Sequence, residues 1–515
     1  MHVRLDIIKR SLSHPSSDQA RAAASAAGVA NLVDYLREVA PQLSADYLVH
    51  NAVVPIAMSE MELVLGTWVE TIDPQVVDAF AAKFGRPVRA ISLAERELRA
   101  AINEVYFSES ADRIIADYGD VDVAVRGGVI TGHDLLQLAN EPPVIQLVNV
   151  LLKDAIALSA SDVHVESTPV GLRVRYRIDG VLQDVATPPA AMQAAVISRI
   201  KVMADLDIAE RRKPQDGRIA LRMRDASVDV RVSTVPSLHG ESIVMRLLNR
   251  GVERVKLTEL GMSDSTFQQF AAALRGSSGV VLVTGPTGSG KTTSLYAAVD
   301  YIRTGEQKIL SVEDPVEYEL EGVPQITANG MGGISFASAL RAVLRQDPDV
   351  LLIGEVRDSE TAVIAMQASL TGHLVLSSMH TIDAPSAIIR LIDLGVDPYL
   401  IASSIRAIVA QRLVRRNCPN CCGPTAGAGS HDLSEPVIRG AGCAMCRQTG
   451  YRGRVGVFQI FVLDDEIRAA VYRRADVESL RQLGSARGMH SLERDALRHV
   501  RSGVTTPEEV ARVIG

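Results

Sequence analysis

Between about residues 257 and 413, short apolar runs alternate with segments whose apolar residues recur at helical spacing. The runs "GVVLVT" and "DVLLIG" are continuous enough to form strands that are buried on both faces. Strands that alternate with helices in this way are typical of a parallel sheet with crossover helices. We therefore expect an α/β domain over residues 257–413.

The flanking segments have other patterns. Over residues 142–250, "PPVIQLVNVLLKDAIALSA" has helical spacing, while "GLRVRYRIDGVLQDV" and "ASVDVRVSTV" alternate as strands do, which predicts a second α/β segment. Residues 1–110 combine the helical patterns of "SSDQARAAASAAGVANLVDYLREVA" and "AERELRAAINEVYF" with the strand-like "ELVLGTWVET", which indicates a small α/β module. We expect residues 111–141, which contain paired glycines, to form a linker, and residues 453–515 to be helical.

The composition is that of an ordinary globular protein. Its 515 residues are too many for one core, so roughly three to four domains are expected. The net charge of −7 and the 4% of aromatic residues give no sign of a nucleic-acid partner. No apolar run is long enough to span a membrane, and the N-terminus lacks the apolar core of a secretory signal. We expect a cytoplasmic protein that contacts a membrane only indirectly, through a partner.

The stretch "GPTGSGKT" follows the apolar run "GVVLVT" and precedes the helical "KTTSLYAAVDYI". This is the P-loop pattern, in which glycines let backbone N–H groups surround phosphates and a lysine reaches the β- and γ-phosphate oxygens. Lys291 is that lysine, and the hydroxyl of Thr292 is the expected ligand of magnesium. The sequence therefore predicts an ATP site formed by Gly285, Pro286, Thr287, Gly288, Ser289, Gly290, Lys291, Thr292 and Thr293.

Acidic residues follow the P-loop at two places. "DVLLIGEVRD" ends its apolar run at Glu355, although Gly354 stands where many P-loop enzymes have an aspartate. "SVEDPVEYEL" places Glu313, Asp314 and Glu317 beside a proline turn. Like charges held close together suit a site that polarises an attacking water, and a solvated acidic turn is the alternative.

Two histidines flank one predicted strand, in "TGHLVLSSMHTIDA". The strand would separate His373 from His380 by roughly 23 Å, which is too far for one metal ion. The pair is better suited to phosphate sensing than to metal binding.

All five cysteines lie within residues 414–452, and four of them form two CxxC pairs. Two such pairs complete a tetrahedral zinc site, which is structural because four sulfur ligands leave no open coordination position. Reduced, buried thiols are the alternative, and Cys422 competes with its neighbour as a ligand although the spacing favours the neighbour. The expected zinc ligands are Cys418, Cys421, Cys443 and Cys446.

Taken in order, these segments resemble the type II/type IV secretion ATPase superfamily. The resemblance rests on "SASDVHVE", "RIKVMADLDIAERRKPQDGRI", "VDVRVSTVPSLHGESIVMRLL", "GPTGSGKTTSLY", "VEDPVEY", "ALRAVLRQDPDVLLIGEVRDSETA", "ASLTGHLVLSSMHTIDA" and "TGYRGRVGVF", and it extends from about Pro142 to the C-terminus. The chain looks most like the assembly ATPases of type II secretion (GspE-like), and is also close to the type IV pilus extension ATPases (PilB-like). The resemblance implies a PAS-like lobe over residues 142–250, a RecA-like P-loop lobe over residues 257–413 and a hexameric ring.

The resemblance also implies roles for individual residues. Lys291 and Thr292 belong to the Walker A site, Glu313 to the Asp box as water activator, Glu355 to Walker B and His380 to the His box. Each of these roles is an expectation carried over from the family's motifs.

In this superfamily, arginines of the PAS-like lobe complete the ATP site, often that of the adjoining subunit. The positions that match are Arg231 and Arg246, and Arg212 and Arg218 are further candidates. A guanidinium suits this role because it offers a planar set of donors to phosphate and stays charged. A salt bridge on a strand face is the alternative for each arginine.

The resulting hypothesis is an ATPase that drives pseudopilus assembly for type II secretion; a type IV pilus extension ATPase is the alternative. A nucleic-acid motor and a nucleotide-binding scaffold with little turnover are the hypotheses from other classes. The resemblance implies a homohexamer, peripheral recruitment to the inner membrane, and contact with an inner-membrane platform protein. It also implies that residues 1–110 dock on an inner-membrane secretion-system protein with a cytoplasmic domain.

Overall fold

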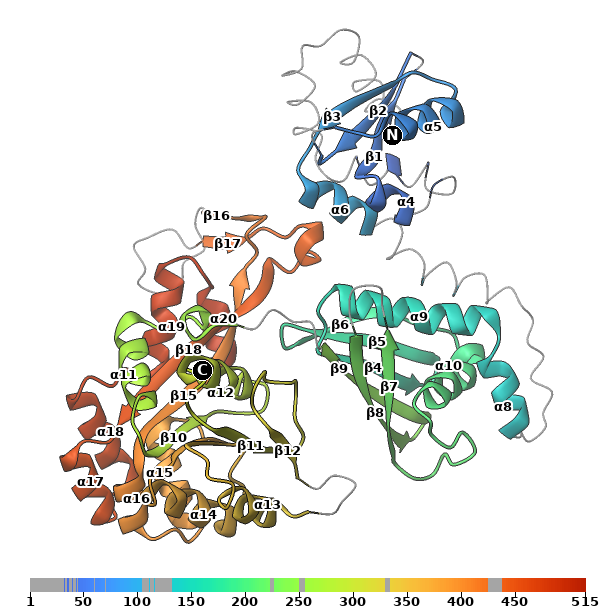
Figure 1. Cartoon of the computed structure of the whole chain (residues 1–515). Helices are drawn as coiled ribbons and strands as arrows, with labels where there is room; N and C mark the ends of the chain where they lie inside the picture. Colours follow the sequence, from blue (N-terminus) through green and yellow to red (C-terminus); the bar gives the residue numbers. More distant parts are fainter. Residues whose placement is uncertain are drawn as a thin grey trace. The chain divides into compact units, whose positions relative to one another are not determined.

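The computed structural model describes residues 45–103 except 60 and 70, then 132–222, 227–249, 255–328, 334–424 and 438–515, and the isolated residues 32, 35, 36, 39, 43, 111 and 115. The chain divides into two compact units (Figure 1). One unit comprises Met1–Leu221 and Asp229–Leu247, and the other comprises Arg222–Val228 and Leu248–Gly515.

The N-terminal module is a three-stranded sheet with helices. Its elements are α4 (Ala45–His50), β1 (Val53–Met58), β2 (Leu63–Thr67), α5 (Pro74–Phe84), β3 (Val88–Ser92) and α6 (Glu95–Asn103). β1 pairs with β2 antiparallel, and β2 pairs with β3 parallel. The predicted strand and the second predicted helix of this region are therefore present as β2 and α6. Most of the first predicted helix, residues 16–40, lies outside the described residues.

The next part of the same unit is a six-stranded sheet in the order β6-β5-β4-β9-β8-β7. Its elements are α8 (Gly132–Ala139), α9 (Pro142–Ala157), β4 (Asp162–Thr168), β5 (Gly171–Ile178), β6 (Val181–Ala186), α10 (Ala190–Met203), β7 (Gln215–Arg222), β8 (Ser227–Ser237) and β9 (Gly240–Asn249). Helix α8 falls within the expected linker 111–141, so the linker prediction is wrong there: Leu135 and Ala139, four residues apart, are both buried, and α8 packs on α10. The antiparallel pairing around β4 agrees with the predicted strands of this region.

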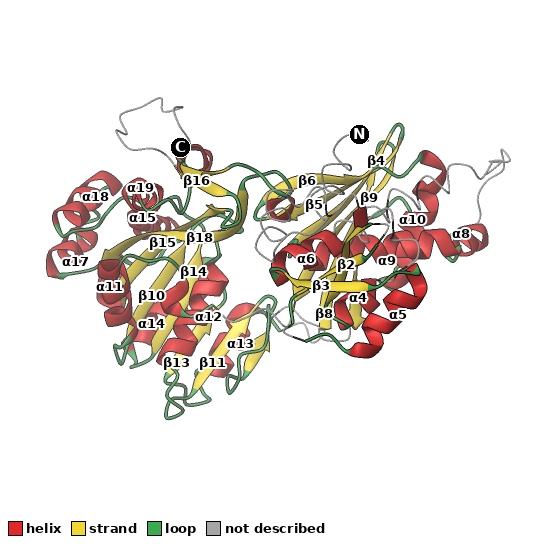
Figure 2. Ribbon diagram, turned by 90° about the horizontal axis from the view of Figure 1, so that it is seen from above, coloured by secondary structure: helices red, strands yellow, loops and turns green. Residues whose placement is uncertain are grey.

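The second unit is organised around a seven-stranded sheet in the order β12-β11-β13-β14-β10-β15-β18. Figure 2 shows helices beside this sheet. The elements are η3 (Leu257–Glu259), α11 (Asp264–Leu274), β10 (Gly279–Thr284), α12 (Lys291–Ile302), β11 (Ile309–Glu313), β12 (Gln325–Thr327), α13 (Phe336–Val343), β13 (Val350–Ile353), α14 (Ser359–Leu370), β14 (Leu374–Met379), α15 (Ala384–Asp393), α16 (Pro398–Ser404) and β15 (Ile405–Asn417). The six strands from β10 to β15 pair in parallel, as the alternating pattern predicts.

Both faces of this sheet are buried. Along β10, Val280 and Leu282 belong to one apolar core, while Val281 and Val283 belong to another. Because successive side chains of a strand point to opposite faces, an apolar core covers each face. This explains why the sequence of β10 is an unbroken apolar run.

The C-terminal part adds an antiparallel edge strand, two short strands and helices. Its elements are β16 (Cys422–Pro424), β17 (Ile438–Gly440), η4 (Ala444–Cys446), β18 (Tyr451–Val462), α17 (Asp465–Tyr472), α18 (Val477–Ala486), α19 (Leu492–Arg501) and α20 (Pro507–Ile514). The helical prediction for residues 453–515 is wrong for its first ten residues, since these lie in β18. The apolar run "VGVFQIF" within β18 completes the sheet by pairing with β15, for example Val409 with Ile460.

Among the described residues, the helices are all too short or too polar to span a bilayer.

Candidate nucleotide site and metal centre

The predicted phosphate loop lies between the end of β10 and the start of α12. Gly285, Gly288 and Gly290 have φ angles of 154°, 78° and 86°, in a region that favours glycine. A Cβ atom on Gly290 would also lie 2.8 Å from Nε2 of Gln411. Gly290 occupies the N-cap of α12 without a side-chain cap, so the first N–H groups of that helix remain available to an anion. The remaining predicted nucleotide-binding residues lie on this loop and the first turn of α12, namely Pro286, Thr287, Ser289, Lys291, Thr292 and Thr293.

The Lys291 side chain lies over the loop. Its Nζ donates hydrogen bonds to the carbonyl oxygens of Gly285 and Pro286, at 2.9 and 3.0 Å. Burial lowers the pKa of Lys291 to about 8; the charge of Glu355 opposes this shift and that of Arg412 adds to it. The ammonium therefore loses its proton as the pH rises past about 8, and an added anionic group would favour its charged form.

Glu355 and His380 meet beside Lys291. His380 Nε2 lies 3.4 Å from Glu355 Oε2, and His380 Nδ1 lies 3.5 Å from Lys291 Nζ. Glu355 Oε1 also accepts a hydrogen bond from Arg357 Nη2 at 2.5 Å. Glu355 follows β13 and His380 follows β14, so both lie at the carboxyl edge of the parallel strands, as does the P-loop. This edge is where open α/β sheets bind ligands.

Glu313 lies in a buried polar network instead of facing solvent. The residue is 3% exposed. Its Oε2 accepts a hydrogen bond from the Tyr296 hydroxyl at 2.5 Å, and its Oε1 accepts from Ser311 Oγ at 2.7 Å and Gln325 Nε2 at 3.1 Å. Burial and the neighbouring carboxylate raise the pKa of Tyr296, so the phenol stays protonated and donates a hydrogen bond to Glu313. In this conformation the Glu313 carboxylate is engaged by three donors.

Hydroxyl groups connect the P-loop strand to the His380 segment. Thr284 Oγ1 lies 2.6 Å from Thr381 Oγ1 and accepts a hydrogen bond from the Thr381 backbone N–H at 3.0 Å. His373 lies at the other end of β14, where its Nδ1 is 2.8 Å from the Ala368 carbonyl oxygen. The two histidines therefore have different surroundings, and only His380 lies at the nucleotide site.

The sequence reading missed two β15 residues at this site. The buried Gln411 accepts a hydrogen bond from Ser294 Oγ of α12 at 2.7 Å. Arg412 donates to the carbonyl oxygens of Ile382, at 2.6 Å, and of Gln411, at 3.0 Å, and burial lowers its pKa. The only signal in the sequence is that both are polar residues within a strand that is otherwise mostly apolar.

The predicted phosphate-binding arginines belong to the other unit. Arg231 lies on β8 and Arg246 on β9, and Arg246 Nε donates to Asp162 Oδ1 at 3.1 Å. Arg212 is 92% exposed at the side chain. Their part in a nucleotide site stays a prediction.

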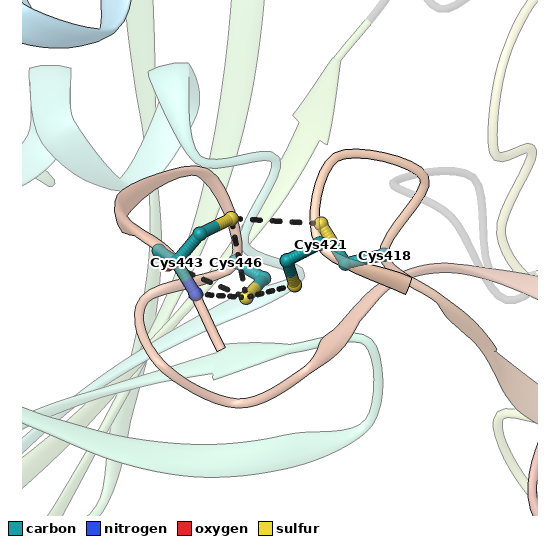
Figure 3. Close-up of side chains that lie close together, drawn as sticks. All are labelled: Cys418, Cys421, Cys443 and Cys446. Atoms are coloured by element: carbon teal, nitrogen blue, oxygen red, sulfur yellow. Dashed lines mark hydrogen bonds between the residues drawn. The ribbon is translucent and has the colours of Figure 1, made fainter. Parts of the chain in front are cut away.

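The four predicted zinc ligands come together in the second unit (Figure 3). All four sulfur atoms lie within 4.8 Å of one another, and the separations of Cys418 from Cys443, Cys421 from Cys446 and Cys443 from Cys446 are 3.8, 3.8 and 3.7 Å. Zn–S bonds of about 2.3 Å in a tetrahedron require sulfur atoms about 3.8 Å apart. The cluster therefore fits a Zn²⁺ ion.

Donors around the cluster favour a thiolate at Cys443, whereas burial raises the pKa of the Cys418 thiol and raises that of Cys421 to about 12. The backbone N–H groups of Cys443 and Gly450 donate to Cys446 Sγ at 3.2 and 3.3 Å, and Asn420 Nδ2 donates to Cys443 Sγ at 3.4 Å. Burial raises the pKa of the Cys443 thiol, but hydrogen bonds, first of all from Asn420, outweigh it and lower that pKa to about 6. Cys422 is exposed in β16 and is not one of the clustered residues.

Residues 137–512 match the family of type II/IV secretion system proteins. The chain belongs to this family. The match covers the motifs on which the resemblance rests, so the predicted kinship with secretion ATPases is confirmed.

Two relatives show how far the similarity extends. The type II secretion system protein HxcR of Pseudomonas aeruginosa is 51% identical over 380 residues, which are 74% of this chain and 79% of that protein. The type II secretion system ATPase E of Vibrio cholerae is 43% identical over 436 residues, which are 82% and 86% of the two chains.

A solved structure shares the fold. The ATPase DotB of Legionella pneumophila is similar with a TM-score of 0.54 and 21% identity over 71% of this chain and 94% of DotB. This likeness supports a mixed α/β secretion-ATPase fold, and the PAS-like character of the six-stranded sheet stays a prediction.

Proposed function

We propose that this protein hydrolyses ATP and that the hydrolysis drives pseudopilus assembly and protein export by a type II secretion system. The observation that carries the proposal is the convergence of Lys291, His380 and Glu355 beside a P-loop in a chain 43% identical to a type II secretion system ATPase. The comparisons favour secretion over pilus extension because both relatives described above bear type II secretion names.

The nucleotide's triphosphate would lie over residues 285–292, held by backbone N–H groups at the N-terminus of α12 and by the Lys291 ammonium. Thr292 would hold Mg²⁺, which neutralises charge on the β- and γ-phosphates. Glu355 is well suited to polarise the attacking water because its carboxylate is partly exposed and adjoins Lys291 and His380. His380 would orient Glu355 and respond to the γ-phosphate.

Glu313 would act indirectly, because its hydrogen bonds go to Tyr296 and Gln325 and not to Lys291, Glu355 or His380. Its buried hydrogen bonds to Tyr296 and Gln325 connect α12, which starts at the P-loop, to the end of β11. A direct role in activating water would require the carboxylate to leave these donors. We therefore assign Glu313 a positioning role, and the activation of water to Glu355.

The functional assembly would be a homohexamer in which Arg231 and Arg246 of one subunit reach the nucleotide of the next. An arginine supplied from a neighbouring subunit makes hydrolysis depend on assembly.

The four-cysteine centre would hold a structural Zn²⁺ ion and take no part in the chemistry. Residues 1–110 would dock on an inner-membrane secretion-system protein with a cytoplasmic domain, and the assembled ATPase would act on the platform protein from the cytoplasmic side.

The test is a pair of measurements with wild-type protein and Glu355→Gln. ATP turnover is measured with the purified full chain, and a strain lacking the gene is complemented and assayed for exported protein and for surface pili. We expect Glu355→Gln to bind Mg²⁺-ATP but to turn it over at least about a hundredfold more slowly, and to restore no export. Normal export by the Glu355→Gln strain would refute the proposal, and restoration of pili without export would assign the motor to pilus extension.

A further inference from the structure

A cavity of about 580 Å³ opens in the second unit at the edge of the sheet opposite the P-loop. The P-loop follows the last residue of β10, whereas this cavity adjoins the first, Gly279, and the six residues of the strand span about 17 Å. We call it the rear cavity. Two arginines and several hydroxyl groups line it, including Arg406, Arg468, Ser278, Ser369, Ser403 and Ser404.

The fold makes room for Arg406. The pairing of β10 with β15 shifts between Val280 and Val281, so that Arg406 is an extra residue without a partner in β10. A β-bulge of this kind redirects a side chain. The guanidinium then lies against Gly276, where a Cβ atom would come within 2.0 Å of Nη1, and the side-chain stem lies against Gly279. Residues with side chains at these two positions would displace Arg406.

Arg468 brings a second guanidinium to the same cavity. It donates a hydrogen bond to the Ala402 carbonyl oxygen, and Arg406 Nη1 donates to the Ser278 carbonyl oxygen at 2.9 Å. Each arginine therefore satisfies one backbone carbonyl oxygen. Each guanidinium has five N–H donors, however. Neither arginine forms an ion pair with a carboxylate of the described residues, and Asp464, which precedes Arg468 by one helical turn, pairs with Arg487 instead.

The cost of this arrangement points to a ligand. Burial lowers the pKa of Arg468, the charges of Asp465 and Asp464 partly offset this, and the nearby charge of Arg406 lowers it further. Two cations thus lie close together, and among the described residues the nearby aspartates form no ion pair with either of them. A phosphate monoester carries a charge of about −2 near neutral pH, which matches two guanidinium groups better than a single carboxylate does.

We propose that the rear cavity binds a small organic phosphate of nucleotide size, with the phosphate held by Arg406 and Arg468. A volume of about 580 Å³ lies within the usual range of about 300–1,000 Å³ for small-molecule sites. The hydroxyls of Ser278 and Ser403 would complete the phosphate shell, since Ser369 and Ser404 already donate to the Met366 carbonyl oxygen. Leu370 and Val462, which are 48% and 41% exposed, would contact the ligand's less polar part. This site is separate from the ATP site and does not rest on the proposed ATPase function.

The test uses the full chain with saturating Mg²⁺-ADP, so that the nucleotide site is occupied, and titrates AMP, inorganic phosphate and citrate by calorimetry. We expect AMP to bind, and Arg406→Gln and Arg468→Gln each to weaken it about tenfold or more, since each removes a charge-assisted contact. Arg473→Gln removes the same charge at an exposed position outside the cavity and should leave AMP affinity unchanged.

A further variant covers the case in which the arginine variants misfold. Ser403→Asp adds a carboxylate at an exposed cavity residue without removing an arginine, and it should abolish AMP binding. AMP binding of equal strength in wild type and in all folded cavity variants would overturn the proposal, as would no binding at millimolar AMP. Citrate that binds more tightly than both phosphates would overturn the assignment to a phosphate ligand.

Discussion

His380 joins the phosphate-loop lysine to the acidic strand end: its Nδ1 lies 3.5 Å from Lys291 Nζ, and its Nε2 lies 3.4 Å from Glu355 Oε2. The Lys291 ammonium can only donate a hydrogen bond, so Nδ1 would accept and Nε2 would carry the proton that faces Glu355. Three motifs that are far apart in the sequence therefore act as one polar unit.

Replacing Glu355 by Gln should separate binding from hydrolysis. The amide keeps the size of the side chain but cannot act as a base, so we expect unchanged Mg²⁺-ATP affinity within about threefold and turnover reduced by about a hundredfold or more. Steady-state hydrolysis and equilibrium nucleotide binding measure the two effects. Glu360→Gln is the matched control, because Glu360 is exposed on α14 and pairs with Arg341. Equal turnover in both variants would remove Glu355 from the chemistry.

Nucleotide affinity should fall as the pH rises above 8. Burial lowers the pKa of Lys291 to about 8. Above that pH the free protein loses the ammonium that would hold the phosphates. At the limit, affinity for Mg²⁺-ADP then falls about tenfold per pH unit. Titrations at about pH 7, 8 and 9 measure the trend, with the exposed Lys308→Met variant as the control that retains it. A Lys291→Met variant should bind weakly with no such slope, and an equal slope in that variant would assign the titration to another group.

Tyr296→Phe should destabilise the protein through Glu313. The change leaves a buried carboxylate without its 2.5 Å donor, which costs about 1–3 kcal/mol of unfolding free energy. Denaturant unfolding of the full chain measures the loss, and Tyr301→Phe is the control, since the Tyr301 hydroxyl contacts Arg275 at an exposed site. Similar stabilities for the two variants would show that the Tyr296 hydroxyl contributes little to holding Glu313.

Cys443→Ser should remove the metal, whereas Cys422→Ser should not. Cys443 belongs to the four clustered sulfur ligands, and Cys422 lies outside them. We expect about one zinc per chain in wild type and Cys422→Ser, and little zinc with a lower melting temperature in Cys443→Ser. Elemental analysis of purified protein decides the matter. Loss of zinc in Cys422→Ser with retention in Cys443→Ser would reassign the ligands.

Acid should weaken the contact between α20 and β15 as the pH falls below about 4.5. Burial raises the pKa of Glu509, but hydrogen bonds from Arg512 and Arg415 outweigh that effect and lower the pKa to about 2. Because the folded pKa lies below the unfolded value of about 4.5, the stabilisation is full above pH 4.5 and is lost as the pH falls towards 2.

Glu509→Gln should reproduce this loss at neutral pH. It breaks a buried ion pair and costs about 3–5 kcal/mol, measured by denaturant unfolding at pH 7. Glu508→Gln is the control, because Glu508 forms an exposed pair with Arg439 and its loss should cost about 1 kcal/mol or less. Equal losses in the two variants would contradict a special role for Glu509.

The sequence predicted the features that short-range patterns encode. Glycine spacing marks the P-loop, and paired CxxC segments mark the four cysteines, because in each case neighbouring residues supply the geometry. The same holds for β10, whose continuous apolar run reflects burial on both faces. The strand β18 was misread because the helical segments that follow it suggested a helical end, while its partner β15 lies more than 30 residues earlier.

What the sequence could not predict depends on tertiary contacts. Arg415 and Glu509 meet although they lie 94 positions apart, and nothing local distinguishes them from surface charges. Glu313 looks like an exposed acid in "VEDPVEY", yet the fold buries it against Tyr296 and Gln325. Arg412 comes to the nucleotide site only because β15 pairs beside β10.

Strand β15 carries Gln411 behind the P-loop and ends at Asn417, directly before Cys418. The four clustered cysteines and the P-loop are therefore connected through one continuous strand. Removal of a metal ion from the cysteines by a chelator, or their oxidation, would disturb this strand at its C-terminal end, next to Asn417. ATP turnover by a purified preparation would then depend on the metal content and oxidation state of its cysteines.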